Sequence, residues 1–570
     1  MVPRFLLVSL NIDAILGEVT ISKRGQKLNQ MTKGNHLGDA YSTTLARMKA
    51  QKGSRSRLGI EALMWVSNSE RPLYTTELCH ALGVKIGSSD LDVGNVPTIR
   101  TLLACSLGLI TVDASSSTVR LVHFSLQEYL SNNLSLFQSP HSMIAEVCLT
   151  YLDFRCVREL SPLSWVPSTL PFVGYASGYW GTHMRKGSAG SVEPLALKLL
   201  LEFEQHISSQ QLLRCYDKDK RWWEQDFGKG RDLKGFTGLH GAAFFGMGEM
   251  VATLLAMGGW DINTTDSTGR TALWLAAEGG HEGVVKLLLG REGIDTNTAD
   301  IAFGLTPLCL AAGRGSEGVV KLLLEQKDIN PNTADTNYGW TPLLWAAVYR
   351  HEGVVRLLLE REDINPNAAD TKFGQTPLSR AVEEGNEGVV KLLLERKDTD
   401  PNTADTLSGQ TPLSWAAECG NERIVKLLLE RDDVNPDIPT LKGETALQLA
   451  ASRGNERVVE LLSTPRPSRP IPAGTDEVPK NPSPDPPDIL QSPSQSTPLV
   501  SLPQPEPLPP NTQPLLGKAI GSFIIISSFV FLLFLVIISP SLTILSLSFH
   551  RCLLSYTWGV SADQTFTDLS

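Results

Sequence analysis

The residues of this sequence that could do chemistry are not spaced for a reaction. Its eight cysteines form no Cys-x-x-Cys pair and have no histidine at ligand spacing, so we expect free thiols and neither a zinc site nor a disulfide framework. Neither His-Glu-x-x-His nor Gly-x-Ser-x-Gly occurs, which removes the usual signatures of a zinc protease and of a serine hydrolase. We therefore predict that the chain is not an enzyme and holds no metal.

A phosphate-binding loop is also missing. Such a loop needs Gly-x-x-x-x-Gly-Lys followed by Ser or Thr, so that backbone N–H groups can cradle the phosphates. Gly517-Lys518 has neither the upstream glycine nor a following hydroxyl. The net charge of −10 and the lack of a dense basic stripe argue against nucleic acid as a partner. We expect no cofactor, no nucleotide without an upstream phosphate loop, and binding as the main activity.

The elements that would carry a binding surface come from an internal repeat. The motif Gly-x-Thr-(Pro/Ala)-Leu, or a near copy of it, begins at Gly235, Gly269, Gly304, Gly339, Gly374, Gly409 and Gly443. Successive copies are 34 or 35 residues apart, a period typical of a stacked solenoid. The sequence therefore predicts seven repeats over residues 235–463.

Each repeat predicts a pair of helices. In the fourth copy, Thr341 can cap a helix through its hydroxyl and Pro342 suits the first helical position. A second helix begins near Gly353, and its valines and leucines form an apolar stripe while Arg356 and Glu360 face solvent. Because one helix pair cannot bury its own apolar face, the repeats must stack on one another.

These motifs resemble ankyrin repeats over roughly two-fifths of the chain. The sequence departs from the family where a histidine usually follows Thr-Pro-Leu and ties adjacent loops together. Only the first copy has a histidine at this position, His240. The later copies have, in order, Trp274, Cys309, Leu344, Ser379, Ser414 and Gln448. The loops between repeats are also slightly longer than is usual, so the resemblance predicts the fold but puts the rigidity of the loops in question.

The resemblance also indicates where a protein partner would bind. In ankyrin proteins the concave face carries the partner through the loop tips, the residue after each loop glycine and the two residues after Ala-Ala. In this sequence those positions include Phe303, Leu305, Tyr338, Trp340, Val348, Tyr349, Phe373, Glu383, Glu384 and Glu418. We expect Tyr338, Trp340 and Tyr349 to be the anchors, because exposed aromatic residues near the centre of a groove often dominate binding energy. The alternative, that these aromatics pack onto neighbouring loops, stays open.

The region before the repeats predicts a winged helix over residues 58–135. Helical segments are followed by two β-prone runs, residues 109–112 and 119–122, joined by a polar turn. Together with the motif His123-x-Ser-x-x-Glu, this order resembles the winged-helix end of a NACHT nucleotide-switch module, as in the NACHT-ankyrin relatives of NOD-like receptors. The resemblance implies that His123 is a vestigial nucleotide sensor and that residues 1–57 are the tail of such a module. Alternatively, His123 is a structural histidine at a strand-to-helix junction.

The remaining segments predict a linker and a tether. Residues 136–234 predict a helical linker domain with helices over 141–152 and 193–216, and its aromatics Tyr175, Tyr179, Trp180, Trp222 and Trp223 either form a recognition surface or pack against the first repeat. Residues 464–517 are rich in proline and predict a disordered, extended linker. Residues 518–540 predict one transmembrane helix whose apolar run is 519–539, followed by a tail over 541–570.

Taken together, the sequence predicts a mainly α protein in which an ankyrin solenoid binds another protein, non-enzymatically, while a single membrane span keeps the array cytosolic. If the apolar tail is an artefact of the gene model, the protein would be cytoplasmic. Two alternatives remain open. In the first, the chain is the C-terminal part of a nucleotide-regulated NACHT NTPase sensor. In the second, it is a membrane scaffold that binds SH3 or WW domains through its Pro-rich tether.

Overall fold

The computed structural model describes residues 20–23, 26, 37–162, 165–187, 192–218 and 235–464. Most of residues 1–36, Trp222 and Trp223, the Pro-rich linker beyond Thr464, the predicted transmembrane helix and the tail lie outside the described residues. No helix within the described ranges is both long and apolar enough to cross a membrane. The membrane span over residues 518–540 therefore stays a prediction.

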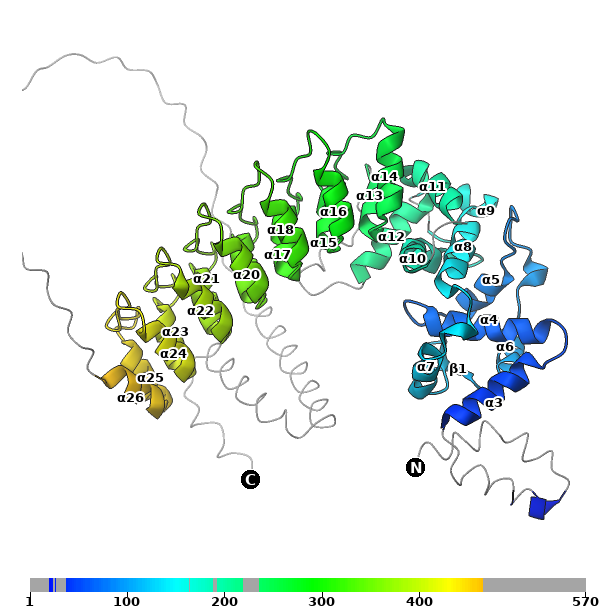
Figure 1. Cartoon of the computed structure of the whole chain (residues 1–570), viewed down its shortest axis with the longest axis horizontal. Coiled ribbons are helices and arrows are strands. Elements are labelled where there is room, and N and C mark those ends of the chain that lie inside the picture. The colour runs from blue at the N-terminus through cyan, green and yellow to red at the C-terminus, as the bar shows by residue number, and fades with distance from the viewer. Residues whose placement is uncertain are drawn as a thin grey trace, which may run out of the picture. The chain divides into compact units, whose positions relative to one another are not determined.

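The N-terminal part of the described chain is a small helical domain with one hairpin. It contains α3 (Leu37–Lys49), α4 (Ser54–Asn68), α5 (Thr75–Gly83), η1 (Val93–Asn95), α6 (Ile99–Cys105), β1 (Ile110–Asp113), β2 (Thr118–Leu121), α7 (Phe124–Ser131) and η2 (Leu134–Leu136). The two strands pair antiparallel, with Ile110 opposite Leu121. The predicted order of helices followed by a hairpin is confirmed (Figure 1).

A helical linker follows and joins this domain to the repeats. Its helices are α8 (Pro140–Leu152), α9 (Arg155–Arg158), α10 (Val173–Lys186), α11 (Glu193–Leu201), η3 (Phe203–Gln205) and α12 (Ile207–Lys218). Helices α4 and α5 pack on α8, whereas α10 and α11 pack on the first helix of the array, α13 (Gly238–Phe245). The linker therefore covers the N-terminal end of the repeat stack, as a solenoid requires.

The prediction of one continuous helix over residues 193–216 is wrong. The chain leaves the helix after Leu201 because Phe203 turns into the core, where it is 1% exposed. His206 then restarts the helix from an extended conformation, since its Nδ1 accepts a hydrogen bond from the backbone N–H of Ser208. Its Nε2 lies 3.1 Å from the carbonyl oxygen of Leu152. The break between α11 and α12 therefore depends on contacts with α8, which cannot be predicted from the residues of this segment alone.

The linker aromatics belong to the core. Tyr175 and Trp180 are fully buried, and the Trp180 ring lies edge-on to Phe245 of the first repeat with 5.1 Å between centroids. The interpretation of these two residues as a recognition surface is therefore wrong, and packing against the first repeat is confirmed.

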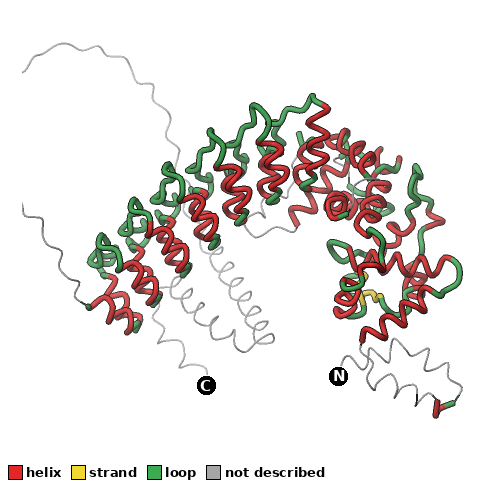
Figure 2. The backbone as a smooth tube through the Cα atoms, viewed as in Figure 1, coloured by secondary structure: helices red, strands yellow, loops and turns green. Residues whose placement is uncertain are grey.

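Seven helix pairs make up the array within the described residues. They are α13 with α14 (Gly248–Met257), α15 (Ala272–Glu278) with α16 (Glu282–Leu289), α17 (Pro307–Arg314) with α18 (Glu317–Leu324), α19 (Pro342–Val348) with α20 (Glu352–Leu359), α21 (Pro377–Glu383) with α22 (Glu387–Glu395), α23 (Pro412–Cys419) with α24 (Glu422–Leu429), and α25 (Ala446–Arg453) with α26 (Glu456–Ser463). First helices pack on first helices and second helices on second helices, so the array has two layers. Figure 2 shows the loops between repeats along one edge of these pairs.

The local signals in the repeat motif act as predicted. The Thr341 hydroxyl accepts a hydrogen bond from the backbone N–H of Leu344, and Pro342 begins α19. Val354 and Val355 of α20 are fully buried, whereas Arg356 is exposed. The same threonine cap occurs in every repeat from the second to the seventh. Helix starts are therefore encoded within five residues of sequence, independently of the neighbours.

Candidate functional site

A buried aspartate shapes each central loop of the array. Asp335 is 4% exposed, and its Oδ1 accepts hydrogen bonds from the backbone N–H groups of Asn337 and Tyr338 at 2.9 and 2.7 Å. Its Oδ2 accepts from the backbone N–H of Trp340 at 3.1 Å and from the indole N–H of Trp345 at 3.0 Å. One carboxylate thus holds the loop in a tight turn and connects it to α19.

The loop tips are joined from one repeat to the next. The backbone N–H of Thr336 donates to the carbonyl of Phe303 at 2.7 Å, that of Thr371 to Tyr338 at 2.8 Å, and that of Thr406 to Phe373 at 2.8 Å. The loop tips that carry the predicted partner-binding residues are therefore connected by a continuous series of backbone hydrogen bonds.

A second series runs through asparagine side chains at the base of the loops. The Asn332 amide donates to the carbonyl of Asp363 at 2.7 Å and its oxygen accepts from the backbone N–H of Asn365 at 2.7 Å. Equivalent bridges to the following repeat are made by Asn263, Asn297, Asn367 and Asn402. The doubt about loop rigidity is thereby answered, because these bonds tie the loops together where most repeats lack the family histidine.

We expect Asn332→Ala to lower the free energy of unfolding by about 1 kcal/mol. The substitution removes two hydrogen bonds, but the groups it leaves behind are exposed and can bond to water, so the loss stays near the value of one net hydrogen bond. Chemical denaturation would measure the change, and hydrogen exchange should speed up in the loop that contains Asn365. The exposed Asn337 of the same repeat, replaced by alanine, provides the control. Equal behaviour of the two variants would contradict a bridging role for Asn332.

Some residues at the family histidine position also bridge repeats. His240 Nε2 lies 3.1 Å from the carbonyl oxygen of Arg270, and the indole N–H of Trp274 donates to the carbonyl of Leu305 at 2.8 Å. Cys309 contacts the carbonyl of Thr333 through its sulfur. In contrast, Ser379 and Ser414 bond only to the capping threonine of their own helix in the bonds that the structure describes.

Four aromatic rings meet on the fourth repeat, and we call Tyr338, Trp340, Trp345 and Tyr349 the aromatic surface. The ring centroids of Tyr338 and Trp340 are 5.1 Å apart, and those of Trp340 and Trp345 are 4.9 Å apart with the rings edge to face. Trp345 and Tyr349 stack with centroids 5.8 Å apart. Trp345 is 8% exposed, while the other three are half-buried. The rings therefore both pack together and keep faces open to solvent.

Cations from the fifth repeat border the aromatic surface. The Arg380 guanidinium lies 5.6 Å from the Trp340 ring centroid and 5.2 Å from that of Phe373, and it pairs with Asp370 at 3.0 Å. Lys372 Nζ lies 5.3 Å from the Tyr338 centroid. Contacts of this kind hold the rings in place. The indole N–H of Trp340 is buried and has no hydrogen-bond acceptor within the part of the chain that the structure describes.

The other predicted site residues lie around this surface with varied exposure. Phe303, Leu305, Val348 and Phe373 are half-buried. Glu383 bonds to Arg380 at 3.1 Å, exposed Glu384 pairs with Arg350 at 3.5 Å, and Glu418 pairs with Arg453. The acidic residues are therefore part of surface ion pairs, which contribute little to stability.

Sequence reasoning missed Trp345 and Arg380, which organise the aromatic surface. The sequence contains a spacing that could have identified them. Trp345 lies ten residues after the loop aspartate Asp335, and Arg380 lies ten residues after Asp370. The same spacing separates Asp405 from Trp415. At Asp300 the tenth residue is Leu310, which has no donor to offer. Burial accordingly raises the pKa of Asp300.

His123 lies at the strand-to-helix junction between β2 and α7. Its Nδ1 accepts from the backbone N–H of Ser125 at 3.2 Å and lies 2.7 Å from the hydroxyl of that residue. His123 is thus the N-cap of α7, in the same His-x-Ser arrangement that His206 makes at α12. This geometry supports the structural interpretation of His123.

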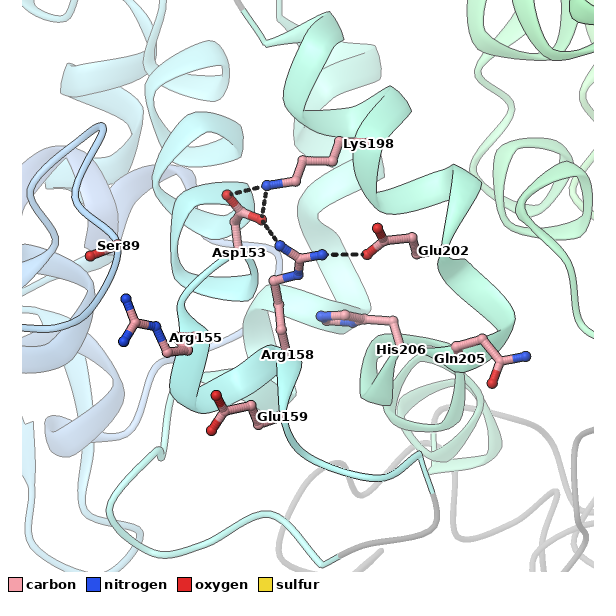
Figure 3. Close-up of a pocket in the computed structure, with 9 residues that line it drawn as sticks. All are labelled: Ser89, Asp153, Arg155, Arg158, Glu159, Lys198, Glu202, Gln205 and His206. Carbon is pink, nitrogen blue, oxygen red and sulfur yellow. Dashed lines mark hydrogen bonds and ion pairs between the residues drawn. The ribbon is translucent and has the colours of Figure 1, made fainter.

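A cavity of about 660 Å³ lies between the N-terminal domain and the linker (Figure 3). It is lined by Ser89, Asp153, Arg155, Arg158, Glu159, Lys198, Glu202, Gln205 and His206. Lys198 pairs with Asp153 at 2.7 Å and Arg158 with Glu202 at 2.7 Å, while both nitrogens of His206 are engaged and burial lowers its pKa. Since Lys198, Asp153, Arg158 and Glu202 are paired with one another and both nitrogens of His206 are engaged, we assign this cavity no reaction.

Comparison with known proteins agrees with this architecture. A family model described as "Ankyrin repeats (3 copies)" matches residues 197–300, 292–370, 334–405, 362–440 and 378–468, and one described as "GPI inositol-deacylase, winged helix domain" matches residues 45–142. Calmodulin-binding transcription activator 4 from Arabidopsis thaliana is 43% identical over 63 residues, which span 10% of this chain and only 6% of that relative.

Two solved structures are also similar. The ankyrin repeat domain of Bcl-3 is 27% identical, with a TM-score of 0.36 over 40% of this chain and 97% of that chain. The ankyrin repeat domain of human ASB11 is 27% identical, with a TM-score of 0.34 over 40% of this chain and 99% of that chain.

The fold and the ordered loops define a helical-repeat scaffold of the kind that binds other proteins. Its repeats match the family model of ankyrin repeats, and the region before them matches the model of a winged-helix domain.

Proposed function

We propose that this chain binds a protein partner on the aromatic surface of its fourth repeat. The observation that carries the proposal is a cluster of four aromatic rings, three of them half-buried. Two of the rings lie on a loop that is tied to both neighbouring repeats, and the other two lie on α19 and at its C-terminal end. Rigid tyrosine and tryptophan side chains supply large contact area at little cost in conformational entropy, so they are frequent anchors of protein interfaces.

The surroundings of the rings suggest what the partner carries. Glu384 is exposed and belongs to a weak ion pair with Arg350, the residue that follows Tyr349. An extended segment with an apolar residue against Tyr349 and a basic residue toward Glu384 would fit these features.

Position-specific crosslinking tests the surface directly. A photoreactive residue at Tyr349 should crosslink to the partner, whereas the same residue at Arg356, exposed on α20 of the same repeat, should not. With the captured partner in hand, the double variant Trp340→Ala and Tyr349→Ala is expected to weaken binding by at least about 30-fold, the effect of losing one strong anchor. Circular dichroism of the variant should keep its helical signal. Unchanged affinity, or equal crosslinking from both positions, would contradict the proposed surface.

A second candidate function is the C-terminal part of a nucleotide-regulated NACHT receptor tethered to a membrane. It is favoured by the order of a winged helix followed by ankyrin repeats. In this proposal only Nε2 of His123 would donate to a phosphate, since Nδ1 accepts from Ser125. The apolar run 519–539 would anchor the array at the membrane through the Pro-rich tether.

A further inference from the structure

Three residues far apart in the sequence meet where the winged-helix region joins the linker. Glu70 follows α4, His141 lies on α8 and His183 lies on α10, and one ligand atom of each lies within 4.8 Å of the other two. The two Nδ1 atoms of the histidines are 2.8 Å apart. His183 is fully buried, whereas the Glu70 side chain is 19% exposed. The cluster therefore has a buried inner part and an outer part that reaches solvent.

Tyr175 holds His183 through the ring nitrogen that points away from His141. The Tyr175 oxygen accepts from the backbone N–H of Glu70 at 3.1 Å and lies 2.9 Å from His183 Nε2. In the tautomer in which Nε2 donates to the Tyr175 oxygen, Nδ1 of His183 presents a lone pair toward His141.

From this arrangement we infer that Glu70, His141 and His183 form a binding site for a divalent transition-metal ion, with Zn²⁺ as the best match. Two imidazoles and one carboxylate are a common three-ligand set for zinc, which leaves the fourth position for water. Bonds of about 2.0 Å place the donors of a tetrahedral ion roughly 3.3 Å apart. The histidine nitrogens need to separate by roughly half an ångström, and the Glu70 carboxylate needs to move inward. His141 must change tautomer so that its Nδ1 also offers a lone pair.

The residues around the cluster resemble the outer shell of a metal site. Tyr175 orients His183 through its second nitrogen, as ligating histidines require. Lys186 bonds to both oxygens of Glu70 at 2.7 and 2.8 Å, and since a carboxylate accepts about four hydrogen bonds or ligands, each oxygen keeps capacity for an ion. The positive charge of Lys186 lowers the affinity of the site. Zn²⁺ held here would join the winged-helix region to the helix that packs on the first repeat.

The test is a zinc titration of the full chain after treatment with a chelator. We expect one equivalent of Zn²⁺ to bind and to raise the midpoint of thermal unfolding, because an ion that binds only the folded state stabilises it. Co²⁺ in its place should give the visible absorption of a tetrahedral ion. The variant His141→Ala is expected to lose more affinity than the about 10- to 100-fold typical of an outer-shell partner, because it removes a direct ligand. His141 is half-buried, so this variant is a safer choice than one of buried His183.

A matched histidine variant completes the experiment. His351→Gln removes a half-buried histidine of the fourth repeat, and Zn²⁺ binding should be unchanged. Glu70→Gln should weaken binding while circular dichroism stays that of the parent. Failure to bind one equivalent of Zn²⁺, binding that survives His141→Ala, or equal losses in the His141 and His351 variants would each overturn the inference.

Discussion

Replacing Asp335 with asparagine is expected to lower the free energy of unfolding by about 3 kcal/mol, because leaving a buried polar group without a partner costs about 1 to 3 kcal/mol. The carboxylate accepts four hydrogen bonds, two at each oxygen. An asparagine must place its NH₂ group at one of these positions, where it faces two N–H donors instead of satisfying them. If Oδ2 is the atom replaced, the indole N–H of buried Trp345 loses its acceptor.

The same substitution should also weaken partner binding. Asp335 holds the loop that carries Tyr338 and Trp340, so a loosened loop no longer presents the aromatic surface in one arrangement. Chemical denaturation would measure the stability change, and hydrogen exchange would show whether it is centred on the fourth repeat.

Asp363→Asn is the matched control for Asp335→Asn. Asp363 forms an exposed ion pair with Arg361 at 2.6 Å, and we expect its loss to change the free energy of unfolding by less than about 1 kcal/mol. If both variants lost the same small amount of stability, the assignment of Asp335 as the organiser of the loop would be wrong.

The second large effect is expected from Gly238→Ala, although two other repeats carry alanine at this position. The first helix begins with alanine in those two repeats, at Ala272 and Ala446, and with proline in the other four, at Pro307, Pro342, Pro377 and Pro412. A Cβ at Gly238 would lie 2.0 Å from the carbonyl oxygen of Leu200 and 2.7 Å from its carbon. These are backbone atoms at the end of α11 and cannot rotate away. The helix must shift, and we expect a loss of about 2 to 3 kcal/mol, as in other overpacked sites.

The sign of the change in the free energy of unfolding shows whether Gly238 is required by its packing against Leu200 or is only a poor helix former. Gly283→Ala provides the comparison, because it replaces a helix N-terminal glycine whose Cβ would meet nothing within 4 Å. Alanine there should stabilise the protein by up to about 1 kcal/mol through its higher helix propensity. Stabilisation by Gly238→Ala as well would show that α11 is not packed against the first repeat. Hydrogen exchange in α11 and α13 should rise in the Gly238 variant.

Several features of the fold could be predicted from the sequence because they depend on residues close together in the chain. Thr341 caps its helix through the backbone three residues on, and Pro342 suits the first helical position in any context. The hairpin of β1 and β2 requires only two short β-prone runs and a polar turn. Because the motif occurs seven times, the same local signals predict the helix pair of each repeat.

Part of the candidate site could be predicted for the same reason, and part of it could not. Tyr338, Trp340 and Tyr349 were found because they occupy repeated positions relative to the loop glycine. Trp345 and Arg380 were missed because their role depends on an aspartate ten residues earlier that turns back to reach them. The sequence did not decide whether the rings pack or stay exposed. In the structure they pack against one another, and three of them are half-buried.

By itself, then, the amino-acid sequence determined the repeats, their helix boundaries and the positions of the central aromatics, since caps, periodicity and turns act over a few residues. Only the tertiary structure decided the contacts between distant segments. It showed that asparagines replace most of the missing histidine bridges, that Phe203 and His206 break a predicted helix, and that Glu70, His141 and His183 converge. Such contacts depend on how helices separated by dozens of residues pack, which no local spacing records.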